Sequence, residues 1–165
     1  MDEANTASLE HHDHDDHHAD KAELRLWLRI LSTGNLVSNE IRRKLRTEFD
    51  VTLPRFDLLA QLQRAPQGLR FGELSKRLMV TNGNLTGLVD RLVEEGYVVR
   101  EPVPGDRRGM VVRATKAGSA IFARMAVAHE AWIKQLFGAM EPQAIDRLID
   151  DLQNLKKSVR QNRLR

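Results

Sequence analysis

The sequence predicts a mainly α-helical fold with one small β-hairpin. From Leu24 onward, apolar residues recur at three- and four-residue spacing over most of the chain, which is typical of amphipathic helices. Residues 97–113 are the exception, because two β-branched runs flank a turn-rich segment there. The chain has 165 residues, 41% of them apolar, which suits one small domain or one dimerising unit.

Three helices are predicted in the first half of the chain. The first covers residues 24–49, and Gly34-Asn35 could kink it. The second follows Thr52, an expected N-cap, and ends at the next Pro-Gly break. The third is short and spans about residues 71–79, where its apolar residues alternate with charged ones at helical spacing.

The second half of the chain contains the hairpin and three further helices. A fourth helix is predicted over residues 82–95 and ends at a glycine. The β-branched runs at residues 97–100 and 110–113 are expected to pair as the two strands of the hairpin. A fifth helix is predicted over residues 115–137, and Pro142 opens a sixth whose apolar residues follow a nearly heptad spacing.

This order of elements predicts a winged helix-turn-helix flanked by N- and C-terminal dimerisation helices. A short helix, a tight turn and a second amphipathic helix form the helix-turn-helix, and the basic hairpin after it is the wing. The first and last helices carry more apolar surface than so small a domain covers, so we expect a second copy of the chain to bury it. The predicted parts are a disordered acidic and His-rich tail at residues 1–22, an N-terminal dimerisation helix at 23–50, a DNA-binding domain at 51–115 and C-terminal dimerisation helices at 116–165.

Charge is unevenly distributed along the chain. There are 26 Lys and Arg against 23 Asp and Glu, a formal net charge of +3. Residues 1–23 contain eight of the acids and one of the bases, so the rest of the chain carries 25 basic and 15 acidic residues. This excess of positive charge in residues 24–165 indicates a polyanionic partner, and double-stranded DNA fits that description.

The N-terminal tail combines histidine with aspartate at residues 11–18, so it could bind a divalent metal. No packed scaffold is expected there to fix a coordination geometry, so we predict a solvated tail and no specific metal or cofactor. Its acidic residues could also compete weakly with DNA for the basic body.

Two further absences narrow the class of protein. The chain has no cysteine, which excludes disulfides and thiolate sites. No apolar run approaches the roughly 20 residues that cross a bilayer, so we expect a cytoplasmic protein without membrane contact.

The fourth helix is the predicted reading helix. Its apolar residues fall on one side of a helical wheel, and its polar residues gather near the N-terminal end of the other side. Asn side chains hydrogen-bond adenine edges, and Thr offers a hydroxyl and a methyl group. Gly83 and Gly87 on the outer side would let the backbone approach DNA closely, or are simply tolerated on a solvated face. The candidate DNA contacts here are Thr81, Asn82, Asn84, Thr86 and Arg91.

The hairpin supplies the second candidate DNA contact. Arg107 and Arg108 lie near its tip, where arginine suits a narrow minor groove with deep negative potential. Asp106 is an unusual neighbour for DNA unless it is paired. We expect Arg91 to be its partner and the pair to act as a brace that fixes the angle of the wing.

Residues 52–118 resemble the winged helix-turn-helix of the MarR family of bacterial regulators. The resemblance is carried by Asp-Arg-Leu at 90–92, Glu-Gly-Tyr-Val-Val-Arg at 95–100, Gly-Asp-Arg-Arg at 105–108 and Val-Arg-Ala-Thr-Lys-Ala-Gly at 112–118. The flanking helices extend it to about residues 24–163. The resemblance implies an obligate homodimer on a pseudopalindromic operator, usually a repressor relieved by a small ligand, with Arg108 as the wing-tip arginine.

The chain also departs from that family pattern. Many members have arginine where this chain has Gly87, so no operator preference carries over. The absence of cysteine excludes the branch that senses peroxide through a thiol. The stretch from Thr52 to Asp90 is similar to members that respond to aromatic acids or their CoA thioesters.

The resemblance also implies that a small-molecule effector of this kind binds in a pocket between the dimer helices and the winged domain. Aromatic and Met walls with one or two cations would suit a planar organic anion, although each of these residues could equally pack in the core or the dimer interface. The basic run at residues 42–46 could hold CoA phosphates, contact the DNA backbone or form a solvated face. The candidate pocket residues are Trp27, Leu31, Arg55, Phe56, Met125, His129 and Trp132.

The sequence therefore predicts a repressor that a small aromatic acid or its CoA thioester releases from its operator. The alternative is a constitutive or architectural DNA-binding protein without an effector. An enzyme is not expected, because the chain has no Gly-rich phosphate loop, no zinc-type His-Glu helix motif and no nucleophile elbow.

Overall fold

The structure is a computed structural model that describes residues 21–103 and 106–162, apart from the side chains of Arg107 and Arg108. Two compact units make up the chain, Met1–Arg43 and Lys44–Arg165. Their boundary falls within α2 (Ala22–Phe49), which is one continuous helix through Gly34 and Asn35. Gly34 and Asn35, where a kink was predicted to be possible, therefore do not interrupt the helix. Most of the predicted tail lies outside the described residues.

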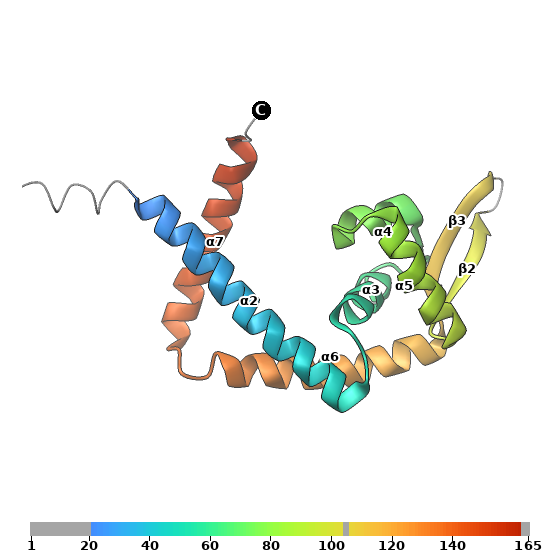
Figure 1. The fold of residues 1–165 in the computed structure, drawn as a ribbon, viewed down its shortest axis with the longest axis horizontal. Helices are drawn as coiled ribbons and strands as arrows, with labels where there is room; N and C mark the ends of the chain where they lie inside the picture. The colour runs from blue at the N-terminus through green and yellow to red at the C-terminus, as the bar shows by residue number, and fades with distance from the viewer. Residues whose placement is uncertain (1–20, 104–105, 163–165) are drawn as a thin grey trace, which may run out of the picture. The chain divides into compact units, whose positions relative to one another are not determined.

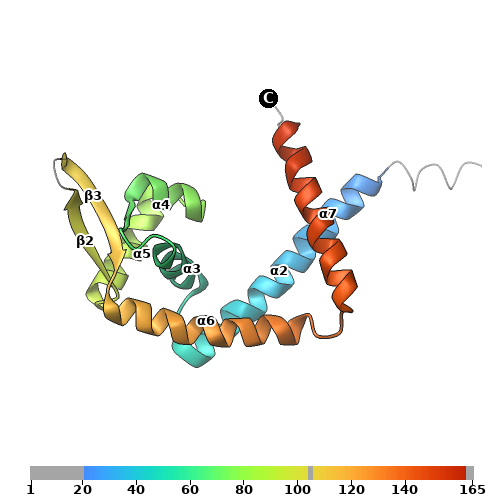
Figure 2. The ribbon, with the colours of Figure 1, turned by 180° about the vertical axis from the view of Figure 1, so that it is seen from behind.

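The second unit holds the remaining helices and the sheet (Figure 1). Figure 2 shows the same unit from behind, and in both views the β2–β3 hairpin lies at one edge, beside α5. The elements in order are α3 (Leu53–Gln63), β1 (Leu69–Arg70), α4 (Phe71–Leu78), α5 (Asn82–Glu94), β2 (Val98–Val103), β3 (Asp106–Ala114), α6 (Lys116–Leu136) and α7 (Pro142–Gln161).

The order of helices, hairpin and helices confirms the predicted fold class, with one addition. The sheet has three antiparallel strands in the order β1-β3-β2, because Leu69 and Arg70 pair with Val112 and Val111 of β3. A strand of two residues is too short to show an alternating apolar pattern, so β1 could not be predicted from the sequence. The strands of the hairpin are also longer than predicted, and Pro102 lies inside β2. Proline is tolerated there because β2 is an edge strand.

The core of the second unit is aliphatic and joins the winged domain to α6. Each helix contributes one apolar face, and the strands contribute the inward side of the sheet. No polar or charged residue is buried among the described residues. Residues exposed by 1% or less are Leu45, Leu58, Leu59, Leu62, Leu74, Leu85, Val89, Leu92, Val98, Val112 and Met125.

Two helices begin at a threonine whose side chain caps them. Thr81 Oγ1 accepts a hydrogen bond from Asn84 N at 3.3 Å, and Thr115 Oγ1 accepts one from Gly118 N at 3.0 Å. Thr52 precedes α3 as predicted, but its side chain makes no capping hydrogen bond. Its backbone carbonyl accepts from Phe56 N at 3.1 Å instead.

The start of α6 is joined closely to the start of the wing. Thr115 N donates to the carbonyl oxygen of Tyr97 at 3.0 Å, and Thr115 Oγ1 donates to that of Gly96 at 2.7 Å. Gly118 lies so close that a Cβ atom there would be 2.0 Å from Tyr97 O. Only glycine fits at this crossing without a shift of the backbone.

We expect Gly118→Ala to lower the free energy of unfolding by about 1–3 kcal/mol, because the added methyl group overlaps backbone atoms that cannot rotate away. Gly83→Ala is the matched control. It lies in α5 with no atom within 4 Å of the added Cβ, so alanine there should raise the free energy of unfolding by about 0.5–1 kcal/mol. Urea unfolding measures both. Effects of the same sign at the two positions would contradict the close packing at Gly118.

The turn between α4 and α5 has a strained residue. Met79 caps α4 with φ 53° and ψ 40°, the left-handed conformation that side chains disfavour, and it is 91% exposed. We expect Met79→Gly to raise the free energy of unfolding by about 0.5–1 kcal/mol, since the strain is relieved and little packing is lost. Met79→Ala retains a Cβ atom and should leave stability nearly unchanged. A destabilising glycine in urea unfolding would contradict the assignment.

Candidate nucleic-acid interface

The orientation of α5 is set by the residues that it buries. Leu85, Val89 and Leu92 are 0–1% exposed and turn one side of the helix inward. The residues on the opposite side are therefore exposed, apart from Asp90, which is partly covered. The predicted reading residues Thr81, Asn82, Asn84 and Thr86 are all exposed there, at the N-terminal end of the helix.

The hydroxyl groups on this surface are partly occupied by the helix itself. Thr81 Oγ1 caps the helix, and Thr86 Oγ1 donates to Asn82 O at 2.9 Å. Within the described part of the chain, the carboxamides of Asn82 and Asn84 form no hydrogen bond with another residue. They keep a donor and an acceptor each, the pair of groups that reads an adenine edge.

Two glycines lie among these polar residues. A Cβ atom at Gly83 or Gly87 would have nothing within 4 Å. The chain therefore does not need glycine at either position for its own packing. Their outward position leaves bare backbone on the exposed side of α5, which permits close approach by a partner.

The turn that precedes the reading helix is held by Ser75 of α4. Its Oγ donates to Val80 O at 2.6 Å, and Val80 N donates back to Ser75 O at 3.2 Å. These two bonds close the loop on both sides of Met79. They fix the angle between α4 and α5 from within the turn.

The wing arginines lie in β3, but the side chains of Arg107 and Arg108 are outside the described part of the structure. Asp106 is described, and its partner differs from the prediction. Arg70 Nη1 donates to Asp106 Oδ2 at 2.9 Å, so the ion pair joins β1 to the start of β3 rather than joining α5 to the wing. Gly109 makes room for this carboxylate, because a Cβ atom there would lie 2.5 Å from Asp106 Oδ2.

Arg91, the predicted partner of Asp106, lies near Arg55 of α3. Burial lowers the pKa of Arg55, and the positive charge of Arg91 lowers it further. Arg55 forms an ion pair with Glu95 at the C-cap of α5, while its Nε is buried without a hydrogen-bond partner among the described residues. The predicted effector cation is therefore already paired with a carboxylate of its own chain.

A link between the wing and the reading helix comes from Arg100 in β2. Its guanidinium pairs with Asp90 of α5 and lies 5.7 Å from the ring centre of Phe71 at the start of α4. The sequence placed Arg100 in the hairpin but did not indicate either contact. Nothing in the spacing of residues 71, 90 and 100 distinguishes this trio from other charged and aromatic residues nearby.

The other predicted effector residues of this unit form a packed aromatic cluster. Phe56 and Trp132 are each 7% exposed and Met125 is fully buried. The ring of His129 lies 5.0 Å from that of Phe56 and 6.5 Å from that of Trp132, centre to centre. The cluster has the geometry of core packing. An open hollow of about 530 Å³ lies next to it, lined by Phe49, Ala123, Arg124 and Val127.

The remaining two, Trp27 and Leu31, belong to the first unit. They are 56% and 43% exposed on α2. Both therefore have apolar surface that this chain leaves in contact with solvent.

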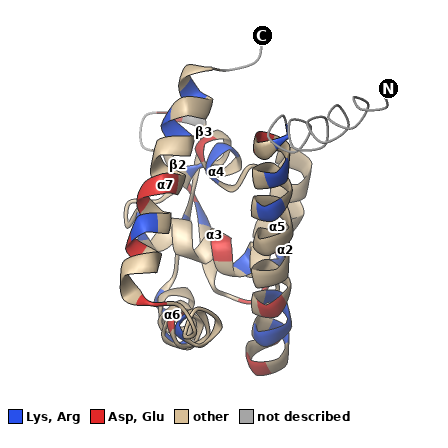
Figure 3. Cartoon of the chain, turned by 90° about the vertical axis from the view of Figure 1, so that its left-hand side faces the viewer, with Lys and Arg blue, Asp and Glu red and all other residues tan. Residues whose placement is uncertain are grey.

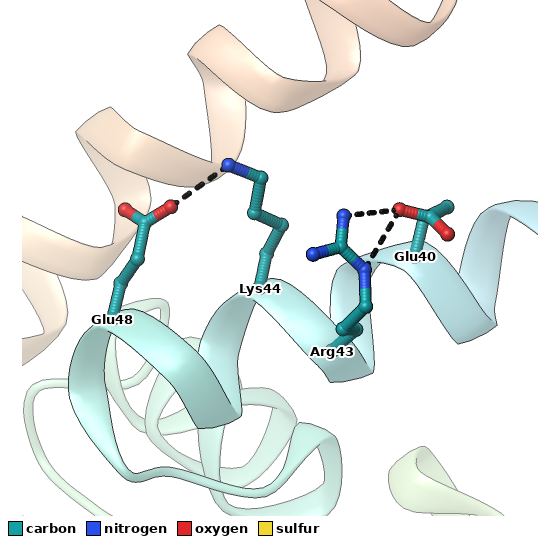
Figure 4. Close-up of polar contacts among 4 residues, drawn as sticks. All are labelled: Glu40, Arg43, Lys44 and Glu48. Atoms are coloured by element: carbon teal, nitrogen blue, oxygen red, sulfur yellow. Dashed lines mark hydrogen bonds and ion pairs between the residues drawn. The ribbon is translucent and has the colours of Figure 1, made fainter.

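The basic run in α2 is largely compensated by neighbours one helical turn away (Figure 4). Lys44 also lies 5.9 Å from the ring centre of Trp132. This arrangement supports the solvated face among the three predicted roles, because each cation already has a local partner. The partners are Asn39 Oδ1 for Arg42 at 2.8 Å, Glu40 for Arg43 at 2.7 Å, Glu48 for Lys44 at 3.0 Å and Asp50 for Arg46 at 3.2 Å.

Two features of the described residues bear on the class of site. They contain no group of three or more His, Cys, Asp or Glu arranged to hold a metal ion. The histidine-rich segment at residues 11–18 lies outside the described part. Among the described helices, none is long and apolar enough to cross a membrane.

Known proteins with this arrangement are regulators of transcription. A sequence model of the MarR family matches residues 49–109. The regulator PecS of Dickeya dadantii is 31% identical over 106 residues, which are 63% of this chain and 64% of PecS. The chain thus spans slightly less than two thirds of that relative. The multiple antibiotic resistance protein MarR of Escherichia coli is 36% identical over 102 residues, 58% of this chain and 70% of MarR.

Solved structures agree with the sequence comparison. The MarR family transcriptional regulator from Silicibacter pomeroyi has a TM-score of 0.73 and 35% identity, over 86% of this chain and 97% of that one. Sco3205 from Streptomyces coelicolor, solved in complex with DNA, has a TM-score of 0.73 and 25% identity, over 83% and 87% of the two chains. The identity to MarR and to the Silicibacter regulator, over most of each of those proteins, establishes that this chain belongs to the MarR family.

Proposed function

We propose that this chain is a homodimeric, DNA-binding regulator of transcription. The observation that carries the proposal is the one-sided burial of α5, which leaves Asn82 and Asn84 exposed beside the bare backbone at Gly83 and Gly87. In this proposal α5 enters a major groove and the wing reaches the adjacent minor groove. The likeness to Sco3205, which was solved in complex with DNA, supports DNA as the partner.

The apolar surface of α7 supports a second copy of the chain as partner. This helix has no buried residue, and its Leu148, Ile149 and Leu152 are 45%, 48% and 43% exposed. Figure 3 shows residues of both charges along the same helix. An apolar stripe with charged flanks is typical of a helix that packs against another helix. A twofold dimer would bury the stripe and present two copies of α5 about 34–36 Å apart, one turn of DNA.

The proposed regulator is a repressor that a small aromatic acid or its CoA thioester releases from DNA. Support for an aromatic anion comes from the hollow beside the aromatic cluster, where Phe49 offers a ring and Arg124 a cation. Moving a population of dimers from 1:99 to 99:1 between two states requires about 5.5 kcal/mol of difference in ligand affinity. The second candidate is a constitutive or architectural DNA-binding protein, which the close packing of Phe56, Met125 and Trp132 favours.

The sign of regulation needs a direct test. BadR of Rhodopseudomonas palustris, 34% identical over 96 residues, is named a transcriptional activatory protein. A promoter-reporter fusion that contains the bound site decides between the two signs. Repression predicts higher reporter output when the gene for this chain is deleted.

DNA binding is tested with a 30-bp duplex selected by the wild-type protein from a random library. We expect Arg108→Ala to weaken binding. Because one phosphate contact is lost, the slope of log K against log salt concentration should also decrease in magnitude by about 0.9. Lys134→Ala, at the other end of α6, removes the same charge and should change neither. Mobility-shift titrations at several salt concentrations measure both quantities. An Arg108 variant with wild-type affinity and slope would contradict the wing contact, and failure to select any duplex would contradict DNA binding itself.

An effector is tested by thermal unfolding with benzoate, 4-hydroxycinnamate and their CoA thioesters. A ligand at 100 times its Kd should add about 2.7 kcal/mol to the free energy of unfolding. Arg124→Gln should remove that gain for the two free acids if their carboxylate binds in the hollow at Phe49. No stabilisation by any of the four compounds would favour the constitutive alternative.

A further inference from the structure

Among its described residues, the wing has few polar contacts with α4 and α5. The Glu101–Arg113 pair joins β2 to β3, and the Arg70–Asp106 pair joins β1 to β3, so both lie within the sheet. The Arg100–Asp90 pair is different, because it joins β2 to α5. An ion pair that crosses between elements constrains their relative angle, which a pair inside one sheet does not.

The contacts of Arg100 reach three elements at once. Its backbone is paired with Val112 in the sheet, its guanidinium pairs with the Asp90 carboxylate on α5, and the same guanidinium lies over the Phe71 ring at the start of α4. Asp90 is one helical turn beyond Thr86 and directly precedes Arg91, so this contact lies among the predicted DNA-contacting residues. One side chain therefore holds the base of the wing to both helices of the helix-turn-helix.

Apolar packing between α4 and the outer part of the hairpin is sparse. An open hollow of about 700 Å³ lies there, bordered on one side by Phe71, Glu73 and Lys76 and on the other by Arg100 and Met110. Met110 is 41% exposed. With little packing to support it, the angle of the outer hairpin depends on the contacts at its base.

The charge of Arg100 is also compensated within the chain. Its side chain is 33% exposed and that of Asp90 is 46% exposed. A guanidinium that already has a carboxylate partner gains less from a DNA phosphate than an unpaired one. This arrangement suits a side chain that orients other groups.

From these contacts we propose that Arg100 is a positioning residue for DNA binding: it holds the wing at the angle to α5 that lets both enter neighbouring grooves, and does so through Asp90 and Phe71 without contacting DNA. The proposal rests on the proposed function for its consequence in DNA binding. The structural part concerns this chain alone and is testable without DNA.

The DNA-free test measures the distance between α5 and the wing. The chain has no cysteine, so spin labels at Asn84→Cys and Met110→Cys are specific, and dilution with unlabelled protein isolates distances within one protomer. We expect Arg100→Gln and Asp90→Asn to broaden the distance distribution measured by pulsed electron resonance. The control Arg113→Gln breaks a pair within the hairpin and should leave the width unchanged. A distribution that is equally narrow in the Arg100→Gln protein would overturn the proposal, whatever the protein does with DNA.

The DNA test uses the selected 30-bp duplex and separates positioning from direct contact. Arg100→Gln should raise Kd about tenfold, equivalent to the loss of one well-placed groove contact, with the wild-type salt slope. Asp90→Asn removes a negative charge, so charge alone predicts tighter binding, whereas loss of the anchor predicts weaker binding. In the double variant the two losses should not add, since they break the same contact.

Three results of this second test would count against the proposal. A salt slope lowered by about 0.9 or more in Arg100→Gln would identify a phosphate contact instead. Tighter binding by Asp90→Asn, or fully additive losses in the double variant, would show that the pair does not act as a unit. Urea unfolding of each variant confirms that the fold is retained, as expected for a partly exposed pair.

Discussion

Burial of three aliphatic side chains on α5 is the constraint on which the interface depends. Leu85, Val89 and Leu92 can reach the core only if the helix is rotated one way about its axis. That rotation decides which residues face outward, and it places the carboxamides and the bare glycine backbone together. The polar surface is thus a consequence of apolar packing. A helix with the same polar residues and a weaker apolar face would present them in no fixed direction.

Local signals predicted most of the fold, and long-range partners account for what was missed. The caps at Thr81 and Thr115 act within three residues, so their effect can be derived from the sequence. The partner of Asp106 cannot, because Arg70 lies 36 positions away and several other arginines are equally plausible. The strand β1 was missed for the same reason, since two residues become a strand only through their pairing with β3.

The same contrast between local signals and long-range contacts applies to the candidate site. Periodicity was sufficient to predict which side of α5 is exposed, because helix geometry converts spacing into direction. It could not separate aromatic residues that line a pocket from those that fill a core. Phe56 and Trp132 satisfy both descriptions in sequence, and only their mutual packing distinguishes them. Net charge has a similar weakness as a guide to binding surfaces. Lys44 and Arg46 contribute to it, but the carboxylates of Glu48 and Asp50 neutralise their charges locally.

The hydrogen bonds of Thr115 and the close crossing at Gly118 have a mechanical consequence. They fasten the first turn of α6 to the backbone at Gly96 and Tyr97, between α5 and β2. Any tilt of this end of α6 would therefore also move the segment that joins α5 to the hairpin, because the backbone at Gly96 and Tyr97 cannot shift independently of the helix.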